Sequence, residues 1–404
     1  MMPDQEVTSR SRKHLPLSGV RVVAIEQAVA APFATRQLAD LGADVIKVER
    51  VGEGDFARGY DETVRGLSSY FVWLNRSKRS IQLDLKSTES EKILTRLLDT
   101  ADVLVSNLGP GAAERLGIGR EQIRKEFPRL VNCLVSGFGA DGPWGNRKAY
   151  DLIVQGEAGL LSITGTGDDG AKVGISIADI ATGMYAFAGI LTALYHREVT
   201  GQATSLNVPV FDSLMEWMGA PLYFTRYGGA PPARSGMAHA TIAPYGPYET
   251  ADGAVILAVQ NAREWASFCR LVLEDESLIP DERFVRNSTR VANRVVLDDL
   301  ITRRTRDMPS DDLVVLLDRA GIAHGGVNSV AQLTDHPLLG PGKRVHVDSE
   351  VGSLEAWLPP IRFSEFSAQM SRVPRAGQDT ESILGEIGFG PSEVARLREA
   401  GVIE

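Results

Sequence analysis

The sequence predicts an α/β protein with an open parallel sheet, followed by a smaller α+β region. Short apolar runs alternate with segments of helical periodicity over the first half of the 404 residues, which is typical of strand–helix–strand crossovers. Such crossovers place helices on both faces of one sheet. A Gly- and Pro-rich stretch at 226–247 ends this alternation, and it predicts a linker or an active-site loop at a domain boundary.

The first half of the chain supplies the predicted sheet. Residues 1–16 are polar and are expected to form a loose arm. The first predicted helix ends before Gly42, which suits a C-cap. We expect strands at 20–25, 44–49, 80–84, 103–106, 130–135 and 205–210, and helices at 32–41, 87–100, 151–162, 179–196 and 210–224.

The second half predicts shorter elements in a different order. In the smaller region we expect strands near 248 and at 254–259, and helices at 262–272, 291–306 and 309–319. Toward the C-terminus we expect strands at 345–347 and 356–358, then helices at 380–387 and 392–400.

Composition excludes several classes of protein. Asp and Glu number 52 against 43 Lys and Arg, so the net charge argues against general binding to nucleic acid, which needs clustered cations. Cys133 and Cys269 have no nearby partner, so we expect neither a disulfide framework nor a redox motif. The start lacks a signal peptide, and the apolar run 183–195 is too short to span a bilayer. We expect a soluble, cytoplasmic protein that binds no membrane.

One glycine motif and several absent motifs narrow the chemistry. Residues 165–170 match GxGxxG, but a helical stretch precedes them, and Asp168 and Asp169 would repel a diphosphate. We therefore interpret them as a turn. The six histidines are scattered and form no HExxH motif, so we expect no metal site. The sequence also contains no Walker motif and no GxSxG motif.

Asp179 is the most informative carboxylate. It stands where an extended run meets a long apolar helix and is flanked by small residues. A helix N-terminus stabilises a carboxylate anion. Position alone leaves two interpretations open, an ordinary N-cap and a carboxylate nucleophile.

Several separate blocks make the chain similar to the family III CoA-transferases, from Leu17 nearly to the C-terminus. This family includes formyl-CoA:oxalate and carnitine CoA-transferases and also the α-methylacyl-CoA racemases. The blocks are LSGVRVVAIEQAVAAP, LGADVIKVER, GEGD, NRSKRSIQLDLK, ADVLVSNLGPGAAERLG, VSGFGADGP, AYDLIVQGEAG, ADIATGMYA, IAPYGPYETADG and HPLLG.

The resemblance implies that Asp179 is the nucleophile. Its carboxylate would attack an acyl-CoA, form a mixed anhydride and then an aspartyl-CoA thioester, and pass CoA to an acceptor acid. It implies no tightly bound cofactor, since CoA enters as part of the substrate. Asp151 is implied to support the site, although it could instead cap the helix that follows it. Residues implied to contact CoA are Arg50, Leu83, Lys86, Asn107, Leu108, Arg115 and Lys148.

The loop that carries His239 departs from the formyl-CoA enzymes, which have a run of glycines there. The sequence SGMAHATIAPYG resembles members that use dicarboxylic acyl groups, such as succinyl-CoA. His239 would help to bind the acyl carboxylate, or it is an ordinary loop histidine. Arg226, Arg234 and Tyr245 are further donors near this loop.

A racemase is the main alternative. Racemases place a histidine where this chain has Tyr150, directly before Asp151. Tyrosine is a poor base for an α-proton because its pKa is near 10. We therefore expect CoA transfer. A non-catalytic acyl-CoA-binding protein is a third interpretation, which the intact block around Asp179 disfavours.

The resemblance also implies an interlocked homodimer, in which each chain passes through a hole in the other. It implies a large Rossmann-like domain whose N-terminal part is residues 17–225 and whose C-terminal part is residues 329–404. Residues 226–328 are implied to form a small α+β domain with its linkers.

Overall fold

The computed structural model describes residues 15–404, so nearly all of the expected arm at 1–16 lies outside the described residues. The chain divides into two compact units. Within the described residues, the first unit contains 15–158, Val173–Met218 and Pro341–Glu404, and the second contains Gly159–Lys172 and Gly219–Gly340.

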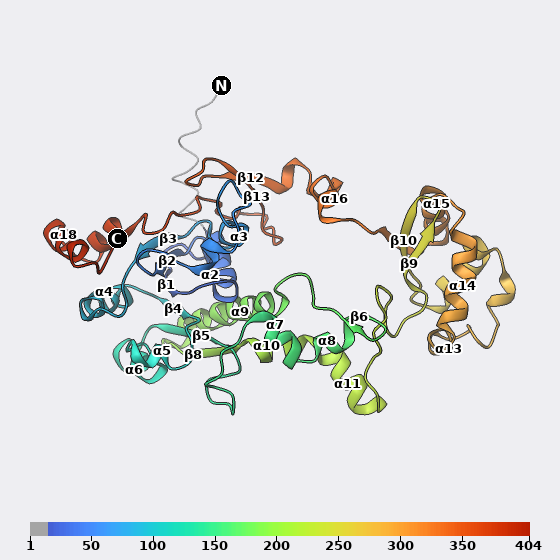
Figure 1. The fold of residues 1–404 in the computed structure, drawn as a ribbon, viewed down its shortest axis with the longest axis horizontal. Helices are drawn as coiled ribbons and strands as arrows, with labels where there is room; N and C mark the ends of the chain where they lie inside the picture. Colours follow the sequence, from blue (N-terminus) through green and yellow to red (C-terminus); the bar gives the residue numbers. More distant parts are fainter. Residues whose placement is uncertain (1–14) are drawn as a thin grey trace, which may run out of the picture. The chain divides into compact units, whose positions relative to one another are not determined.

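A six-stranded sheet forms the centre of the first unit (Figure 1). Its order is β3-β2-β1-β4-β5-β8, and every neighbouring pair is parallel. This is the strand order of the doubly wound nucleotide-binding folds. The strands are β1 (Arg21–Ile25), β2 (Asp44–Glu49), β3 (Arg79–Gln82), β4 (Val103–Ser106), β5 (Val131–Ser136) and β8 (Ser205–Pro209).

Helices cover the faces of this sheet, as its apolar strands require. The central strands β1 and β4 are buried almost along their whole length, so no side of them can face water. The helices of the first unit are α2 (Ala30–Asp40), α3 (Ser69–Asn75), α4 (Thr88–Asp99), α5 (Ala112–Arg115), α6 (Arg120–Glu126), α7 (Asp151–Glu157), α9 (Ile177–Thr200), α10 (Val210–Trp217), α17 (Thr380–Glu386) and α18 (Pro391–Glu399).

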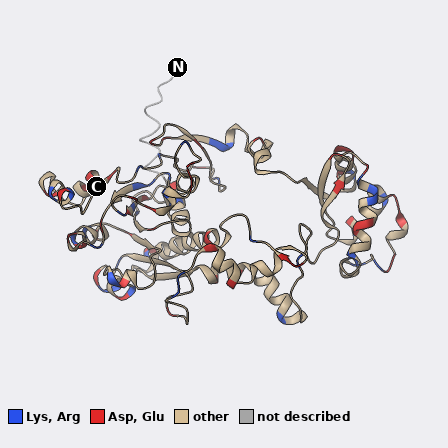
Figure 2. Ribbon diagram, viewed as in Figure 1, with Lys and Arg blue, Asp and Glu red and all other residues tan. Residues whose placement is uncertain are grey.

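Helix α9 is the long apolar helix of the unit, and it has few charged residues (Figure 2). By length and composition alone it could cross a membrane. Its small residues, however, pack within the unit. An added Cβ at Gly183 would lie 2.7 Å from the backbone oxygen of Ala30 in α2. We therefore interpret α9 as a core helix, and the cytoplasmic location stays a prediction.

The C-terminal segment packs beside the outer strand β3. Leu83, just after β3, forms a β-bridge with Ile403, and Asp379 accepts a hydrogen bond from the amide of Ser80 at 3.0 Å. Side chains of α4, α17 and α18 share one apolar core with the strands. A hairpin of β12 (Arg344–Val347) and β13 (Leu354–Trp357) precedes these helices.

The second unit has its own antiparallel sheet, in the order β11-β10-β9, and its own apolar core around Trp265 and Phe284. Its strands are β6 (Gly165–Thr166), β7 (Asp169–Gly170), β9 (Tyr245–Thr250), β10 (Gly253–Ala258) and β11 (Ala323–Gly326). Its helices are α8 (Leu160–Ile163), α11 (Gly219–Gly228), α12 (Ala262–Phe268), α13 (Asn287–Ala292), α14 (Arg294–Thr305), α15 (Ser310–Ala320) and α16 (Val330–Thr334).

Two helices that the sequence predicts as continuous are each divided in two. The helix expected at 151–162 becomes α7 and α8, because Gly159 adopts a left-handed φ of 78° between them. The helix expected at 210–224 becomes α10 and α11. The interpretation of 165–170 as a turn is confirmed, since α8 precedes it and β6 and β7 form a short antiparallel hairpin.

Candidate active site

The sheet reverses its direction of winding between β1 and β4, and ligands of doubly wound folds bind at the carboxyl ends of the strands at such a point. Gln27 follows β1 and Asn107 follows β4, and they are joined by two hydrogen bonds. The backbone amide of Gln27 donates to Asn107 Oδ1 at 3.0 Å, and Asn107 Nδ2 donates to the carbonyl of Gln27 at 2.8 Å. The side chain of Asn107 therefore fixes the backbone at the switch point.

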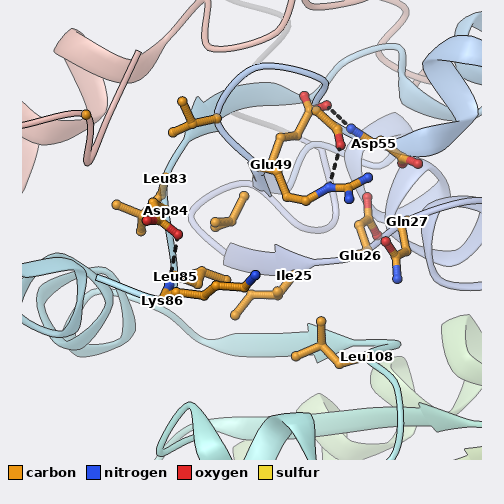
Figure 3. Close-up of a pocket in the computed structure, with 15 residues that line it drawn as sticks. Ile25, Glu26, Gln27, Glu49, Asp55, Leu83, Asp84, Leu85, Lys86 and Leu108 are labelled. Carbon is orange, nitrogen blue, oxygen red and sulfur yellow. Dashed lines mark hydrogen bonds between the residues drawn. The ribbon is translucent and has the colours of Figure 1, made fainter. Parts of the chain in front are cut away.

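Two pockets meet at this point. The first, of about 460 Å³, is lined by residues that follow β1, β2 and β3 (Figure 3). The second, of about 420 Å³, is lined by residues that follow β1, β4, β5 and β8 and by Asp179 of α9. Gln27 and Leu108 line both pockets, so one extended ligand could occupy the two.

The pockets bring together all but one of the residues predicted to contact CoA. Arg50, Leu83, Lys86 and Leu108 line the first pocket, and Asn107, Leu108 and Lys148 line the second. Arg115 lies in α5 and lines neither pocket. The carboxamide of Asn107 is already bonded to the backbone of Gln27, so its contribution to a ligand would come from its backbone.

Some cations of the first unit are paired with carboxylates, whereas in the described part of the chain the predicted CoA-binding cations are not. Arg21, Arg58, Arg76 and Arg79 form ion pairs with carboxylates. By contrast, within residues 15–404 no carboxylate pairs with any of the predicted CoA-binding cations Arg50, Lys86, Arg115 and Lys148. Unpaired cations at the mouth of a pocket suit an anionic ligand such as a phosphate.

Asp179 stands in the first turn of α9 and faces the second pocket. The N-cap alternative for Asp179 is wrong, because α9 begins at Ile177 with Ser176 as the N-cap residue. The capping acceptor comes from α7. Asp151 Oδ1 accepts hydrogen bonds from the amides of Ala178 at 2.8 Å and Asp179 at 3.3 Å.

Asp151 therefore caps the helix of the expected nucleophile. The alternative, that it caps the helix that follows it, is also wrong, because Tyr150 is the N-cap residue of α7 and Asp151 lies in its first turn. The second carboxylate oxygen of Asp151 accepts from Gln155 Nε2 at 2.7 Å, which fixes its orientation. Losing such a cap typically costs a helix about 1 kcal/mol.

The electrostatics of the pocket raise the pKa of Asp179 to about 7. Burial is the larger cause and the nearby negative charge of Asp151 the smaller. Tyr60 lies in the same neighbourhood, since burial and the carboxylates of Asp55 and Asp179 raise the pKa of its hydroxyl. Asp179 can thus change its protonation state near neutral pH.

His239 lies in the second unit, on the loop before β9. Its ring stacks on Tyr245, with centroids 5.1 Å apart, and its Nδ1 accepts a hydrogen bond from the amide of Thr241 at 3.2 Å. The guanidinium of Arg234 donates to the backbone carbonyls of Leu161, Gly167 and Asp168. Arg234 therefore supports the β6–β7 hairpin, which leaves His239, Arg226 and Tyr245 as the donors of this loop.

Several residues in or near the pockets were not predicted from the sequence. Gln27 and Ala28 form the turn after β1, Arg147 lines the second pocket, and Tyr60 lies near Asp179. Gln27 was predictable, because a residue that follows the first strand of a doubly wound sheet stands at the switch point. Tyr60 and Arg147 lie in irregular segments, where no periodicity indicates the direction of a side chain.

No group of three or more His, Cys, Asp or Glu side chains in the described part of the chain is arranged to hold a metal ion. The fold and the pockets instead define an α/β protein with an acidic side chain at the end of an extended, cation-lined binding site.

Comparison with known proteins identifies the class. The profile of CoA-transferase family III matches residues 17–380. The succinate–glutarate CoA-transferase of Agrobacterium fabrum is 33% identical over 94% of this chain and 98% of its own length. The human succinyl-CoA:glutarate CoA-transferase is 31% identical over 96% of this chain and 90% of its own length. A CaiB/BaiF family protein from Brucella suis has a similar crystal structure, with a TM-score of 0.80, 34% identity, and coverage of 92% of this chain and 99% of its own.

The chain therefore belongs to CoA-transferase family III. It is an enzyme of the CoA-transferase class, and CoA thioesters are the substrates of that class.

Proposed function

We propose that the protein transfers CoA from a short dicarboxylic acyl-CoA, such as succinyl-CoA, to a free carboxylic acid, with Asp179 as the nucleophile. The position of Asp179 carries this proposal. Asp179 lines a pocket of about 420 Å³ that shares the lining residues Gln27 and Leu108 with a second, cation-lined pocket. A carboxylate in that position could meet the thioester of a CoA molecule that occupies both pockets.

The proposed reaction is a series of exchanges at carbonyl carbons. The Asp179 carboxylate attacks the thioester and expels CoA thiolate, which leaves a mixed anhydride. The thiolate then attacks the aspartyl carbonyl of the anhydride, so that the donor acid leaves and an aspartyl-CoA thioester remains. The acceptor carboxylate repeats both steps in reverse and regenerates Asp179. No proton, electron or metal ion is consumed, because the complete cycle exchanges one thioester for another and one free carboxylate for another.

The unpaired cations would bind the phosphates of CoA. Arg50 and Lys86 line the first pocket and Lys148 the second, and ammonium and guanidinium groups form strong charge-assisted hydrogen bonds to phosphate oxygens. Leu83 and Leu108 supply apolar wall for the pantetheine arm. Arg115 would act only if CoA extended beyond the two pockets toward α5.

Two observations support a dicarboxylic acyl group. Relatives that match almost the whole chain carry names such as succinate–glutarate CoA-transferase and succinyl-CoA:mesaconate CoA-transferase. The loop before β9 also offers donors for a second carboxylate, because no residue of the described chain bonds to Nε2 of His239. We infer that His239 contacts the distal carboxylate, with Arg226 and Tyr245 as further donors.

A panel of substrates tests this proposal. Succinyl-, glutaryl-, acetyl-, formyl- and octanoyl-CoA would each be incubated with succinate, glutarate, mesaconate and oxalate, and the CoA products identified by mass spectrometry. We expect succinyl- or glutaryl-CoA to exceed formyl- and octanoyl-CoA at least tenfold in kcat/KM. A tenfold advantage of octanoyl- or formyl-CoA would refute the dicarboxylate assignment.

Two further experiments test the covalent mechanism and the racemase alternative. Rapid quenching with succinyl-CoA alone should give a peptide containing Asp179 that carries CoA through a thioester. Uptake of deuterium at the α-carbon of a 2-methylacyl-CoA, without any acceptor acid, would instead identify a racemase. We expect none, because Tyr150 stands where racemases have a histidine.

We further infer that the protein acts in the cytoplasm as an interlocked homodimer, with no nucleic acid or membrane partner. The resemblance to family III supports this inference. The first unit also leaves large apolar side chains exposed on α9 and α10, including Tyr195, Val199 and Trp217, and exposed patches of this kind commonly mark interaction surfaces.

A further inference from the structure

The turn at Gln27 and Ala28 is held in an unfavourable conformation beside the proposed nucleophile. Ala28 has a φ of 63°, in the left-handed region that residues with a Cβ rarely adopt. The turn lines the pocket that contains Asp179, and within residues 15–404 the carboxamide of Gln27 forms no hydrogen bond. Strained backbone of this type persists only where its surroundings enforce it.

Two side chains enforce it here. Asn107 bonds to both the amide and the carbonyl of Gln27, as described above. Asp55 Oδ1 accepts the hydrogen bond of the Ala28 amide at 3.0 Å. Asp55 is only 3% exposed, so its charge must be balanced inside the protein.

Lys47 balances the charge of Asp55 and also binds the backbone next to the turn. Its Nζ lies 2.7 Å from Asp55 Oδ2, and it also donates to the carbonyl of Glu26 at 3.3 Å. Both Lys47 and Asp55 are fully buried as side chains. A buried ion pair of this kind rarely adds net stability compared with apolar residues, which suggests a role other than stability.

The pair belongs to a larger buried network. Lys78 bonds to Glu26 at 2.7 Å, Arg58 forms two hydrogen bonds to Glu49 at 2.8 Å each, and the amide of Asp55 donates to Glu49 Oε2 at 3.0 Å (Figure 3). Three acids thus balance three bases. The members are Glu26, Glu49, Asp55, Lys47, Arg58 and Lys78.

The network includes residues, from three of the sequence blocks, to which the proposed reaction gives no role. Asp55 belongs to GEGD, Lys47 and Glu49 to LGADVIKVER, and Lys78 to NRSKRSIQLDLK. These segments come from different parts of the chain, and the three acids of the network, Glu26, Glu49 and Asp55, line the first pocket.

We propose that Asp55, oriented by Lys47, is a positioning residue that holds the Gln27–Ala28 turn against the pocket of Asp179. Asp55 lines the first pocket but not the pocket that contains Asp179. It acts through the amide of Ala28, which fixes the direction of the Gln27 side chain and of the backbone at the junction of the pockets. This proposal rests on the proposed function of Asp179.

A pair of double variants tests the hydrogen bond to Ala28, and the amide of Ala57, which donates to the same Asp55 oxygen at 2.9 Å, is affected in the same way. D55N/K47M and D55A/K47M both remove the two buried charges together, but only asparagine keeps an acceptor for the Ala28 amide. We expect D55A/K47M to show a kcat at least tenfold below that of D55N/K47M, with KM for acyl-CoA within threefold. The Ala28 amide should also exchange with deuterium at least tenfold faster in D55A/K47M.

The matched control is the buried pair of Asp40 and Arg76, whose side chains form an ion pair at the other end of α2. D40N/R76M should leave kcat within twofold, whatever it does to thermal stability. Equal kcat in D55A/K47M and D55N/K47M, or an equal loss in D40N/R76M, would overturn the proposal.

Substitutions at Ala28 test the same idea without changing the network, in case the double variants do not fold. Ala28→Val should show a kcat at least tenfold below that of Ala28→Gly, because glycine accepts a positive φ and β-branched residues disfavour it. Equal activity of these two variants would contradict the proposal.

The failure of the two proposals can be distinguished. An unaltered chain that transfers no CoA in the substrate panel would refute the proposed function. Deuterium exchange at Ala28 does not depend on turnover, so equal exchange in D55A/K47M and D55N/K47M would refute the role of Asp55 even in an active enzyme.

Discussion

Asp179 must be ionised to act as a nucleophile, yet its pocket raises its pKa to about 7. A dry, partly buried carboxylate is more reactive toward a carbonyl than a hydrated one, at the expense of being partly protonated at neutral pH. The raised pKa also affects stability. The native state binds a proton more tightly than the unfolded chain, so the contribution of Asp179 to stability is greatest below pH 4 and is lost as the pH rises toward 7.

Asp179→Asn should therefore abolish transfer and stabilise the fold at alkaline pH. We expect activity to fall at least a thousandfold because the amide cannot attack the thioester. At pH 8 the free energy of unfolding should rise by about 1–3 kcal/mol relative to the unaltered protein, less than the full shift implies because Asp179 is partly exposed. At pH 4 the two should be equal. Denaturant unfolding at both pH values measures this, and transfer within tenfold of the parent would contradict the assignment of the nucleophile.

Removing the charge of Asp151 should shift the pH profile of CoA transfer. Its negative charge helps to raise the pKa of Asp179, so Asp151→Asn should lower that pKa and move the acid limb of kcat/KM to lower pH. Asparagine keeps an oxygen for the amides of Ala178 and Asp179, whereas Asp151→Ala loses the cap as well and should cost about 1 kcal/mol of stability. An acid limb that does not move in Asp151→Asn would show that the limb does not report Asp179.

At the scale of elements, sequence periodicity predicted which helices and strands exist better than it predicted where they end. Strands such as β2 and β4 were placed correctly because each contains three Val, Ile or Leu residues between segments typical of turns. The short helix α3 was missed, since seven residues give too few turns for a periodic pattern. The division between α7 and α8 depends on the backbone of Gly159, and a glycine inside a helical pattern does not reveal its own φ.

The contact of α2 with α9 joins the Gln27–Ala28 turn to Asp179. At Gly183 an added Cβ would lie 2.7 Å from the backbone oxygen of Ala30 and 2.9 Å from the ring of Phe33. Because backbone cannot give way as a side chain does, the two helices would have to separate.

Gly183→Ala should therefore destabilise the protein by about 1–3 kcal/mol and lower kcat, since it moves Asp179 relative to the turn. Gly189→Ala in the same helix is the matched control. Its Cβ would meet only the end of the flexible Leu206 side chain, so the gain in helix propensity should offset any repacking. Thermal unfolding and steady-state kinetics of both variants provide the measurements, and equal effects at the two positions would contradict this account of the contact.

At the scale of the whole molecule, the sequence predicted the class of the sheet but not the pockets. The alternation of strands and helices indicated a parallel sheet, and the carboxyl ends of its strands do line both pockets. The buried network beneath them could not be predicted, because Lys47 and Lys78 look like ordinary surface cations in a sequence. Only the fold shows that both are fully buried.

The proposed homodimer can be tested by its mass and by exchange of its subunits. A homodimer of this 43.7 kDa chain should have about twice that mass in light scattering. An interlocked dimer has a further property that ordinary dimers lack. Each chain closes around the other, so the subunits cannot separate until at least one of them unfolds.

We therefore expect tagged and untagged dimers, mixed under native conditions for days, to form no mixed dimer. The same mixture, unfolded in urea and refolded together, should give tagged, mixed and untagged dimers in a ratio near 1:2:1. The refolded sample is the control that shows mixed dimers are stable and detectable, and recovered transferase activity would show that refolding is correct. Mixed dimers that form without unfolding would exclude the interlocked arrangement, and a monomeric mass would exclude the dimer itself.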